Sequence, residues 1–406
     1  MTLGGKVTNF GALPLIGSGT FYELFSYVTL AICLFGSSRR FLHSKDLPFR
    51  SLFILFAIYL LIHSFRNIVA ADVFSEKSYY LRVLPFIFVF NAIISTPQPE
   101  LALKRVIKIL ILSAITITLS TVFVSVTGTE IPGLNHEQYE RLGRVIWGYP
   151  STILLASAII LAQVGYQDIF KRHSSFKTLT LLSIFTLAIF FTQSRFLLIA
   201  LILSIIIISF RNTKVNLTRS VILSFLIIGI GVLFSSKAIS RQALSRFSEL
   251  SLESNISTEL LLSGGSFESL GRLAPLVFAL KSNEGLDVWI GAGYHTGFLT
   301  TSNHLHSGLG YVYVTSGILG LVLVYGLLIK IILHYQRFAK RSKITSFEIP
   351  TMKAVIILLK IRMLSSLVIG NMLQESFVVW GVLIGLLELC RRSITEKQHI
   401  YNLSNE

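Results

Sequence analysis

Long apolar runs recur along this chain and constrain its fold more than any other feature. A helix that crosses a bilayer core of about 30 Å needs roughly 20 mostly apolar residues, and the sequence holds about eleven such runs. Runs such as FLLIALILSIIIISF lack the apolar–polar alternation of a membrane β-strand. With 52% hydrophobic and only 14% charged residues, the chain is too apolar for one soluble core. The sequence therefore predicts an all-α polytopic membrane protein.

Most of the predicted spans are separated by short polar segments, and no compositional break marks a soluble domain, so residues 1–406 are predicted to form a single membrane domain. Several Gly residues and Pro14 fall in the first apolar run, so a broken or re-entrant segment there, a twelfth span and either side for the N-terminus stay open. The expected spans are residues 12–36, 51–71, 79–95, 106–127, 149–168, 178–194, 196–210, 220–236, 306–333, 350–370 and 377–391.

Basic residues set the expected orientation of these spans. About twenty of the 36 Lys and Arg fall in alternate connecting segments, which the positive-inside rule places in the cytoplasm. Because the net charge of +16 is spread over these segments and not over one face, it does not indicate nucleic-acid binding. The opposite segments are expected outside the cytoplasm, among them a second loop at 128–148 and a large loop at 236–305 that is predicted to be partly helical.

The charged residues outside the cytoplasm favour phosphate binding by arginine over binding through a metal. The chain has four aspartates, no two of them close in sequence, so a metal-held diphosphate is not indicated. Arginine binds phosphate oxygens in pairs and stays charged in an apolar setting. Arg195 lies between two spans, Arg272 lies in the large loop, and Arg66 and Arg82 flank a short outer loop. Interfacial snorkelling is the alternative reading for Arg195, Arg66 and Arg82, and a plain surface role is the alternative for Arg272.

Two histidines stand where the large loop meets the next span. His304 and His306 are two residues apart, about 200° on a helix, so they do not suit a shared metal. A neutral imidazole near phosphate-binding arginines is suited to accept a proton from a sugar hydroxyl. A role as an interfacial helix cap is the alternative reading.

Four ordered segments resemble the O-antigen polymerase and O-antigen ligase superfamily of bacterial membrane glycosyltransferases. His306 and Ser307, followed after nine residues by GILG at 317–320, resemble the family's H-[N/S/Q]-x9-G-x-x-G pattern. GRLAP at 271–275, IGAGYHTGF at 290–298 and the TQSRF segment resemble further family segments. The match covers most of the chain and is best over residues 190–320; Ser307 departs from the commoner Asn.

The resemblance implies a GT-C-like helical fold and a metal-independent reaction without a cofactor at the periplasmic face of the bacterial inner membrane. Carried over residue by residue, it implies that His306 is catalytic and that Arg195, Arg272 and Arg144 bind the diphosphate of an undecaprenyl-linked glycan. Arg66, Arg82 and His304 are further candidates. The implied partners are the lipid-linked oligosaccharide, membrane lipids and a chain-length regulator.

We expect a polymerase that transfers a glycan from undecaprenyl diphosphate onto a lipid-linked repeat unit of an O-antigen or capsular polysaccharide. The alternative is an O-antigen ligase, which transfers the same donor onto lipid A-core. A lipid-linked oligosaccharide flippase is a third, weaker alternative, because the chain has no internal repeat and has a large outer loop.

Overall fold

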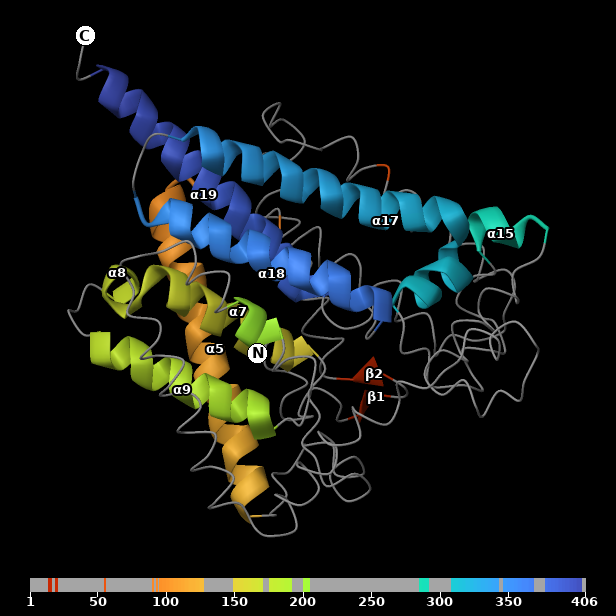
Figure 1. Cartoon of the computed structure of the whole chain (residues 1–406), viewed down its shortest axis with the longest axis horizontal. Coiled ribbons are helices and arrows are strands. Elements are labelled where there is room, and N and C mark those ends of the chain that lie inside the picture. Colours follow the sequence, from red (N-terminus) through yellow and green to blue (C-terminus); the bar gives the residue numbers. More distant parts are fainter. Residues whose placement is uncertain are drawn as a thin grey trace.

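Over the residues that it describes, the structure, a computed structural model, is helical apart from one short pair of strands, and it contains two long apolar helices (Figure 1). The segments Pro99–Phe123 and Ser316–Arg341 are long and apolar enough to cross a membrane. These findings confirm the helical class for the described part of the chain. The structure describes residues 14–16, 19–20, 55, 90, 93, 95–127, 149–170, 175–191, 200–204, 285–291, 308–342, 346–368 and 377–403.

The strands lie where the first span was expected, so a helix from residue 12 is wrong at this point. β1 (Pro14–Ile16) pairs antiparallel with β2 (Gly19–Thr20). Pro14 has no backbone N–H to donate to a helix, and glycine is the least favourable residue in a helix after proline. The Gly and Pro residues at the start of the chain therefore favour a tight turn over a continuous span.

The first long helix among the described residues, α5 (Pro99–Thr127), begins before the predicted boundary at residue 106. Proline suits the first turn of a helix because the N–H that it lacks has no partner there, and Glu100 in that turn complements the helix dipole. Within the apolar part, the Thr118 and Thr121 hydroxyls donate to the carbonyls of Ala114 and Ile117, each at 2.8 Å. Their polar groups are thus satisfied inside the helix itself, as an apolar surrounding requires.

Three further helices follow α5 as an antiparallel group. They are α7 (Tyr149–Val164), α8 (Tyr166–Phe170) and α9 (Ser175–Phe191). The predicted span 149–168 is interrupted at Gly165, whose φ of 86° lies in the left-handed region that glycine adopts readily. The chain turns at this glycine, and α9 then runs back alongside α7 and α5 (Figure 1).

The C-terminal part consists of α17 (Gly308–Arg341), α18 (Glu348–Val368) and α19 (Phe377–Leu403). These helices overlap the predicted spans 306–333, 350–370 and 377–391, and α17 and α19 continue well past the predicted ends. α18 lies against α17, α7 and α19 and carries Lys353, Lys360 and Arg362. Lys360 Nζ donates to Gln336 Oε1 of α17 at 2.9 Å, so this cation has a polar partner within the bundle.

The core runs between these helices, with α7 and α18 at its centre (Figure 1). Nearly every apolar residue of α7 is buried, and the hydroxyl of Ser157 on this helix donates to the carbonyl of Leu110 in α5 at 3.1 Å. By contrast, α5 buries one face and exposes large apolar side chains on the other. This division is expected of a helix that packs on the bundle with one face and meets lipid with the other.

The helix ends fall into two groups, which we call the ion-pair end and the opposite end. Lys397, late in α19, contacts both Glu348 at the start of α18 and Glu100 at the start of α5. The ion-pair end thus contains the starts of α5, α9 and α18 and the ends of α7, α17 and α19, with α8 beside them (Figure 1). The starts of α7 and α17 and the ends of α5, α9 and α18 belong to the opposite end.

Candidate functional site

The residues predicted to carry chemistry all lie outside the described residues. They are His306, His304, Arg195, Arg272, Arg144, Arg66 and Arg82. Their assignment therefore stays a prediction, and the structure reports only on the helices next to them in sequence.

Three of these neighbouring helix ends belong to one end of the bundle. His306 comes two residues before the start of α17, Arg195 four residues after the end of α9, and Arg144 five residues before the start of α7. The start of α17, the end of α9 and the start of α7 all belong to the opposite end. The starts of α7 and α17, 159 residues apart in sequence, and the end of α9 thus lie on the same side of the bundle, away from the basic segments predicted to face the cytoplasm.

At the opposite end, the structure describes a contact between α15 (Asp287–Ile290) and a kink in α17. Gly317 interrupts α17 with a φ of 63° and a ψ of −165°, which is not helical. Gly291 ends α15 with a φ of 77°, and its N–H donates to the carbonyl of Asp287 at 2.8 Å. Both backbone conformations lie in the region that favours glycine.

The two segments approach each other so closely that no side chain fits between them. A Cβ placed on Gly317 would lie 2.4 Å from the carbonyl carbon and oxygen of Trp289 and 2.5 Å from the nitrogen of Gly291. The obstructing atoms belong to the backbone and cannot rotate away. Glycine is therefore required at position 317 both by its own conformation and by the approach of α15.

This contact joins two of the segments that carry the family resemblance. Gly291 belongs to IGAGYHTGF at 290–298, and Gly317 begins GILG at 317–320. Backbone conformations that only glycine adopts readily gather at functional sites, where the surroundings hold them in place. The kink lies at the start of the long apolar segment Ser316–Arg341, after the first turns of α17, which follow His306 in sequence.

The surface of α15 is apolar and exposed. Trp289 of α15 and Leu286, the residue before the helix, are 56% and 69% exposed, and Trp289 was not among the predicted site residues. Tryptophan is enriched at the level of lipid headgroups because its ring is apolar and its N–H is polar. The sequence signal for α15 is a tryptophan directly before the glycine-rich IGAG, a pattern that suits a membrane surface.

The ion-pair end is held by charges from α5, α18 and α19. Glu348 is fully buried and accepts hydrogen bonds from Lys397 at 2.6 Å and from Ser393 at 2.7 Å. Lys397 also lies 3.0 Å from Glu100, which is paired with Lys104 in addition. The ring of Phe347 lies under Lys104 and Lys397, with the two nitrogens 4.9 and 5.7 Å from its centre. Both hydrogen bonds reach Oε1 of Glu348 and offset the cost of burying its charge, whereas Oε2 is buried without a hydrogen-bond partner among the described residues.

Two pKa values at this end are shifted. Burial raises the pKa of Glu348, but the hydrogen bonds led by Lys397 outweigh burial, so that this pKa lies below its usual range. Burial lowers the pKa of Lys397, but hydrogen bonds to Glu348 and Glu100 and the attraction of both charges bring it above its usual range. Both groups therefore stay charged at neutral pH, and the cluster is a structural clamp.

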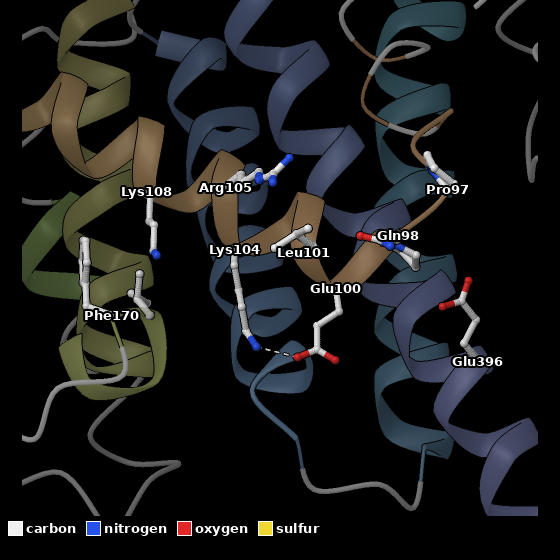
Figure 2. A pocket seen from close by; sticks show the side chains of 11 residues that line it. Pro97, Gln98, Glu100, Leu101, Lys104, Arg105, Lys108, Phe170 and Glu396 are labelled. Carbon is white, nitrogen blue, oxygen red and sulfur yellow. Dashed lines mark hydrogen bonds and ion pairs between the residues drawn. The ribbon is translucent and has the colours of Figure 1, made fainter.

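A pocket of about 690 Å³ opens beside this clamp, between α5, α8 and α19 (Figure 2). Its lining includes the cations Lys104, Arg105 and Lys108, which were expected from sequence only as topology signals. Lys108 and Phe170 lie on one side of the pocket and Glu396 lies on the other (Figure 2). Because α5 begins at Pro99, these cations line the first turns of a helix and not a loop.

Within the part of the chain that the structure describes, no three His, Cys, Asp or Glu side chains gather closely enough to hold a metal ion. Comparison with protein-family models and with curated proteins found no match for this chain.

Proposed function

We propose that the chain is a metal-independent membrane glycosyltransferase of bacterial surface polysaccharide assembly. In this proposal it has eleven to twelve spans in a GT-C-like arrangement in the inner membrane, with its active site at the periplasmic face. It transfers a glycan from undecaprenyl diphosphate onto a lipid-linked repeat unit of an O-antigen or capsular polysaccharide. The proposal rests first on the four ordered segments that resemble the O-antigen polymerase and ligase superfamily.

One structural observation supports the proposal more than any other. Two of the four segments, 290–298 and 317–320, meet through backbone at Gly291 and Gly317, although 25 residues separate these glycines. Segments that build one site must meet in space, and this close approach is what the proposal requires of them. The helix ends next to His306, Arg195 and Arg144 add to this support, because they belong to the same end of the bundle.

The proposed reaction needs a base and a cradle for a diphosphate. The acceptor hydroxyl oxygen forms a bond to the anomeric carbon of the donor while the bond from that carbon to the diphosphate oxygen breaks. The hydroxyl proton passes to the neutral imidazole of His306. Undecaprenyl diphosphate leaves with the bonding electron pair, and Arg195, Arg272 and Arg144 neutralise the charge that develops on its oxygens.

The test is transfer by the purified full chain in liposomes that contain lipid-linked repeat units and no energy source. We expect glycan chains of several repeats, with His306→Ala slowing transfer by about 10²–10⁴-fold. Arg195→Lys keeps the charge but loses the paired geometry, so it too slows transfer. His399→Ala, an exposed histidine at the ion-pair end, serves as the matched control and keeps wild-type activity. Normal glycan ladders from His306→Ala would contradict the assignment.

The same assay separates the alternatives. Transfer only onto added lipid A-core indicates the ligase reaction, and movement of the lipid-linked glycan across the bilayer without any new glycosidic bond indicates the flippase. A chelator leaves transfer unchanged in a metal-independent enzyme. Activity that is lost with a chelator and restored by a divalent cation would contradict that part of the proposal.

A further inference from the structure

The surface of α5 carries one continuous exposed stripe that includes a cation. The exposed positions recur every three or four residues and therefore share one face of the helix. Arg105 lies in this stripe, one turn from Leu101 and one turn from Ile109. The other large apolar members are Leu112, Leu119 and Phe123, of which Leu119 is 65% exposed. The stripe is therefore charged near the ion-pair end and apolar beyond it.

The length of the stripe matches a membrane. From Arg105 to Phe123 the helix rises about 27 Å at 1.5 Å per residue, close to the thickness of a bilayer core. This places Arg105 and Lys108 at the level of the lipid headgroups when the segment Pro99–Phe123 spans the membrane. The apolar members of the stripe then lie at the depth of the acyl chains.

The pocket between α5, α8 and α19 lies at the charged end of this stripe (Figure 2). Lys108 is held beside it by the ring of Phe170, with the nitrogen 5.6 Å from the ring centre. Among the described residues, neither Arg105 nor Lys108 is paired with a carboxylate. The two acids of the lining do not neutralise the charges of these two cations. Glu100 is paired with Lys104 and Lys397, and Glu396 lies across the pocket from Lys108 (Figure 2).

We propose that this pocket binds the phosphate of an anionic phospholipid, with an acyl chain of that lipid lying along the exposed stripe of α5. Arg105 and Lys108 bind the phosphate oxygens, and Ile109 and Leu112 contact the chain. A lipid fits better than a free phosphate because the cations continue directly into an exposed apolar surface. Anionic lipids are enriched in the cytoplasmic leaflet, the side predicted for these basic segments, and basic pockets between membrane helices recognise them. The site is separate from the transferase site and does not depend on it.

The test is binding of phosphatidylglycerol to the purified full chain in nonionic detergent, followed by native mass spectrometry during a lipid titration. The wild type is expected to bind phosphatidylglycerol at least about tenfold more tightly than phosphatidylcholine, which has no net charge. Arg105→Gln with Lys108→Gln lowers the affinity by roughly thirtyfold, as the loss of two cations at a membrane surface predicts. Arg105→Lys with Lys108→Arg keeps the charges and most of the affinity.

A matched control removes the same charge elsewhere at this end. Lys340→Gln with Arg341→Gln acts on two exposed cations in the last turn of α17 and leaves the affinity unchanged. Equal binding of the two lipids, or an equal loss in both double variants, would overturn the proposal. Competition with glycerol phosphate distinguishes a lipid from a free phosphate as the ligand. Complete displacement of the lipid by this soluble anion at millimolar concentration would show that the acyl chain contributes nothing to binding. That result would also overturn the proposal.

Discussion

Gly317 of α17 faces the backbone nitrogen of Gly291 so closely that a Cβ on Gly317 would lie 2.5 Å from it. The two glycines fix the position of α15 against the kink, and neither tolerates a side chain without strain, since φ is 63° at one and 77° at the other. The contact links the end of the large loop to the start of an apolar span. Gly317 lies eleven residues after His306 in sequence.

The first prediction is that Gly317→Ala destabilises the protein by about 2 kcal/mol or more, since left-handed strain adds to a clash with fixed backbone. Unfolding in mixed micelles with increasing SDS measures this change. Gly326→Ala is the matched control, because Gly326 lies in the same helix and a Cβ there meets nothing within 4 Å. The control is expected to be neutral or stabilising by up to about 1 kcal/mol. Equal behaviour of the two variants would contradict the close approach of α15.

The second prediction concerns the buried charge of Glu348. Lys397→Met removes its main cationic partner and leaves a carboxylate buried, at a cost of about 2–4 kcal/mol. The double variant Lys397→Met with Glu348→Gln removes the uncompensated charge and is expected to be more stable than Lys397→Met alone. Lys340→Met, an exposed lysine on α17, is the control and has little effect. A double variant less stable than the single one would argue against a buried charge at Glu348.

The third prediction follows from the shifted pKa values. The pKa of Glu348 is lower in the folded protein than in the unfolded chain, so its stabilising effect is present above the unfolded pKa and is lost as the pH falls through the folded one. The pKa of Lys397 is higher in the folded protein than in the unfolded chain. Its stabilising effect is therefore present below the unfolded pKa and is lost as the pH rises through the folded pKa. The clamp should therefore stabilise the fold fully between about pH 4.3 and pH 10.4, the ordinary pKa values of Glu and Lys.

Melting temperatures measured across this range in detergent give the check. Glu348→Gln is expected to make the melting temperature fall less steeply as the pH is lowered. Glu396→Gln, at an exposed position nearby on α19, leaves this fall as steep as in the wild type. The same fall in melting temperature at acid pH in the wild type and in Glu348→Gln would show that this carboxylate does not cause the loss of stability.

The apolar runs predicted most of the described helices but not where they end. α5 begins seven residues before its predicted start, and α19 continues twelve residues past its predicted end. In both cases the extra turns carry charged residues, such as Lys104 and Lys397, which a hydropathy argument assigns to loops. Lys104 pairs with Glu100 one turn earlier in the same helix, whereas the partner of Lys397, Glu348 of α18, is set by tertiary packing.

The close contacts could not be predicted from sequence spacing alone. Glu348 and Lys397 are 49 residues apart, and nothing local in either segment indicates the other. The glycines at 291 and 317 were singled out by the resemblance, yet only their positive φ angles and mutual approach explain why glycine is needed there. The assignment of His306 and the arginines to the site rests on the sequence pattern alone, because these residues lie outside the described residues.

The last prediction concerns a second buried carboxylate, Glu388 of α19. The hydroxyl of Tyr335, on a fully buried ring, donates to Glu388 at 2.8 Å, and Arg391 donates to both carboxylate oxygens. Tyr335→Phe removes a hydrogen bond to a charged group and should cost about 2 kcal/mol. Tyr325→Phe, in the same helix, removes a neutral bond to Ser366 and should cost about 1 kcal/mol. Both are measured by unfolding in SDS-containing micelles. A larger loss in Tyr325→Phe would mean that Arg391 alone satisfies Glu388, and that α17 and α19 are joined here by packing and not by the hydrogen bond.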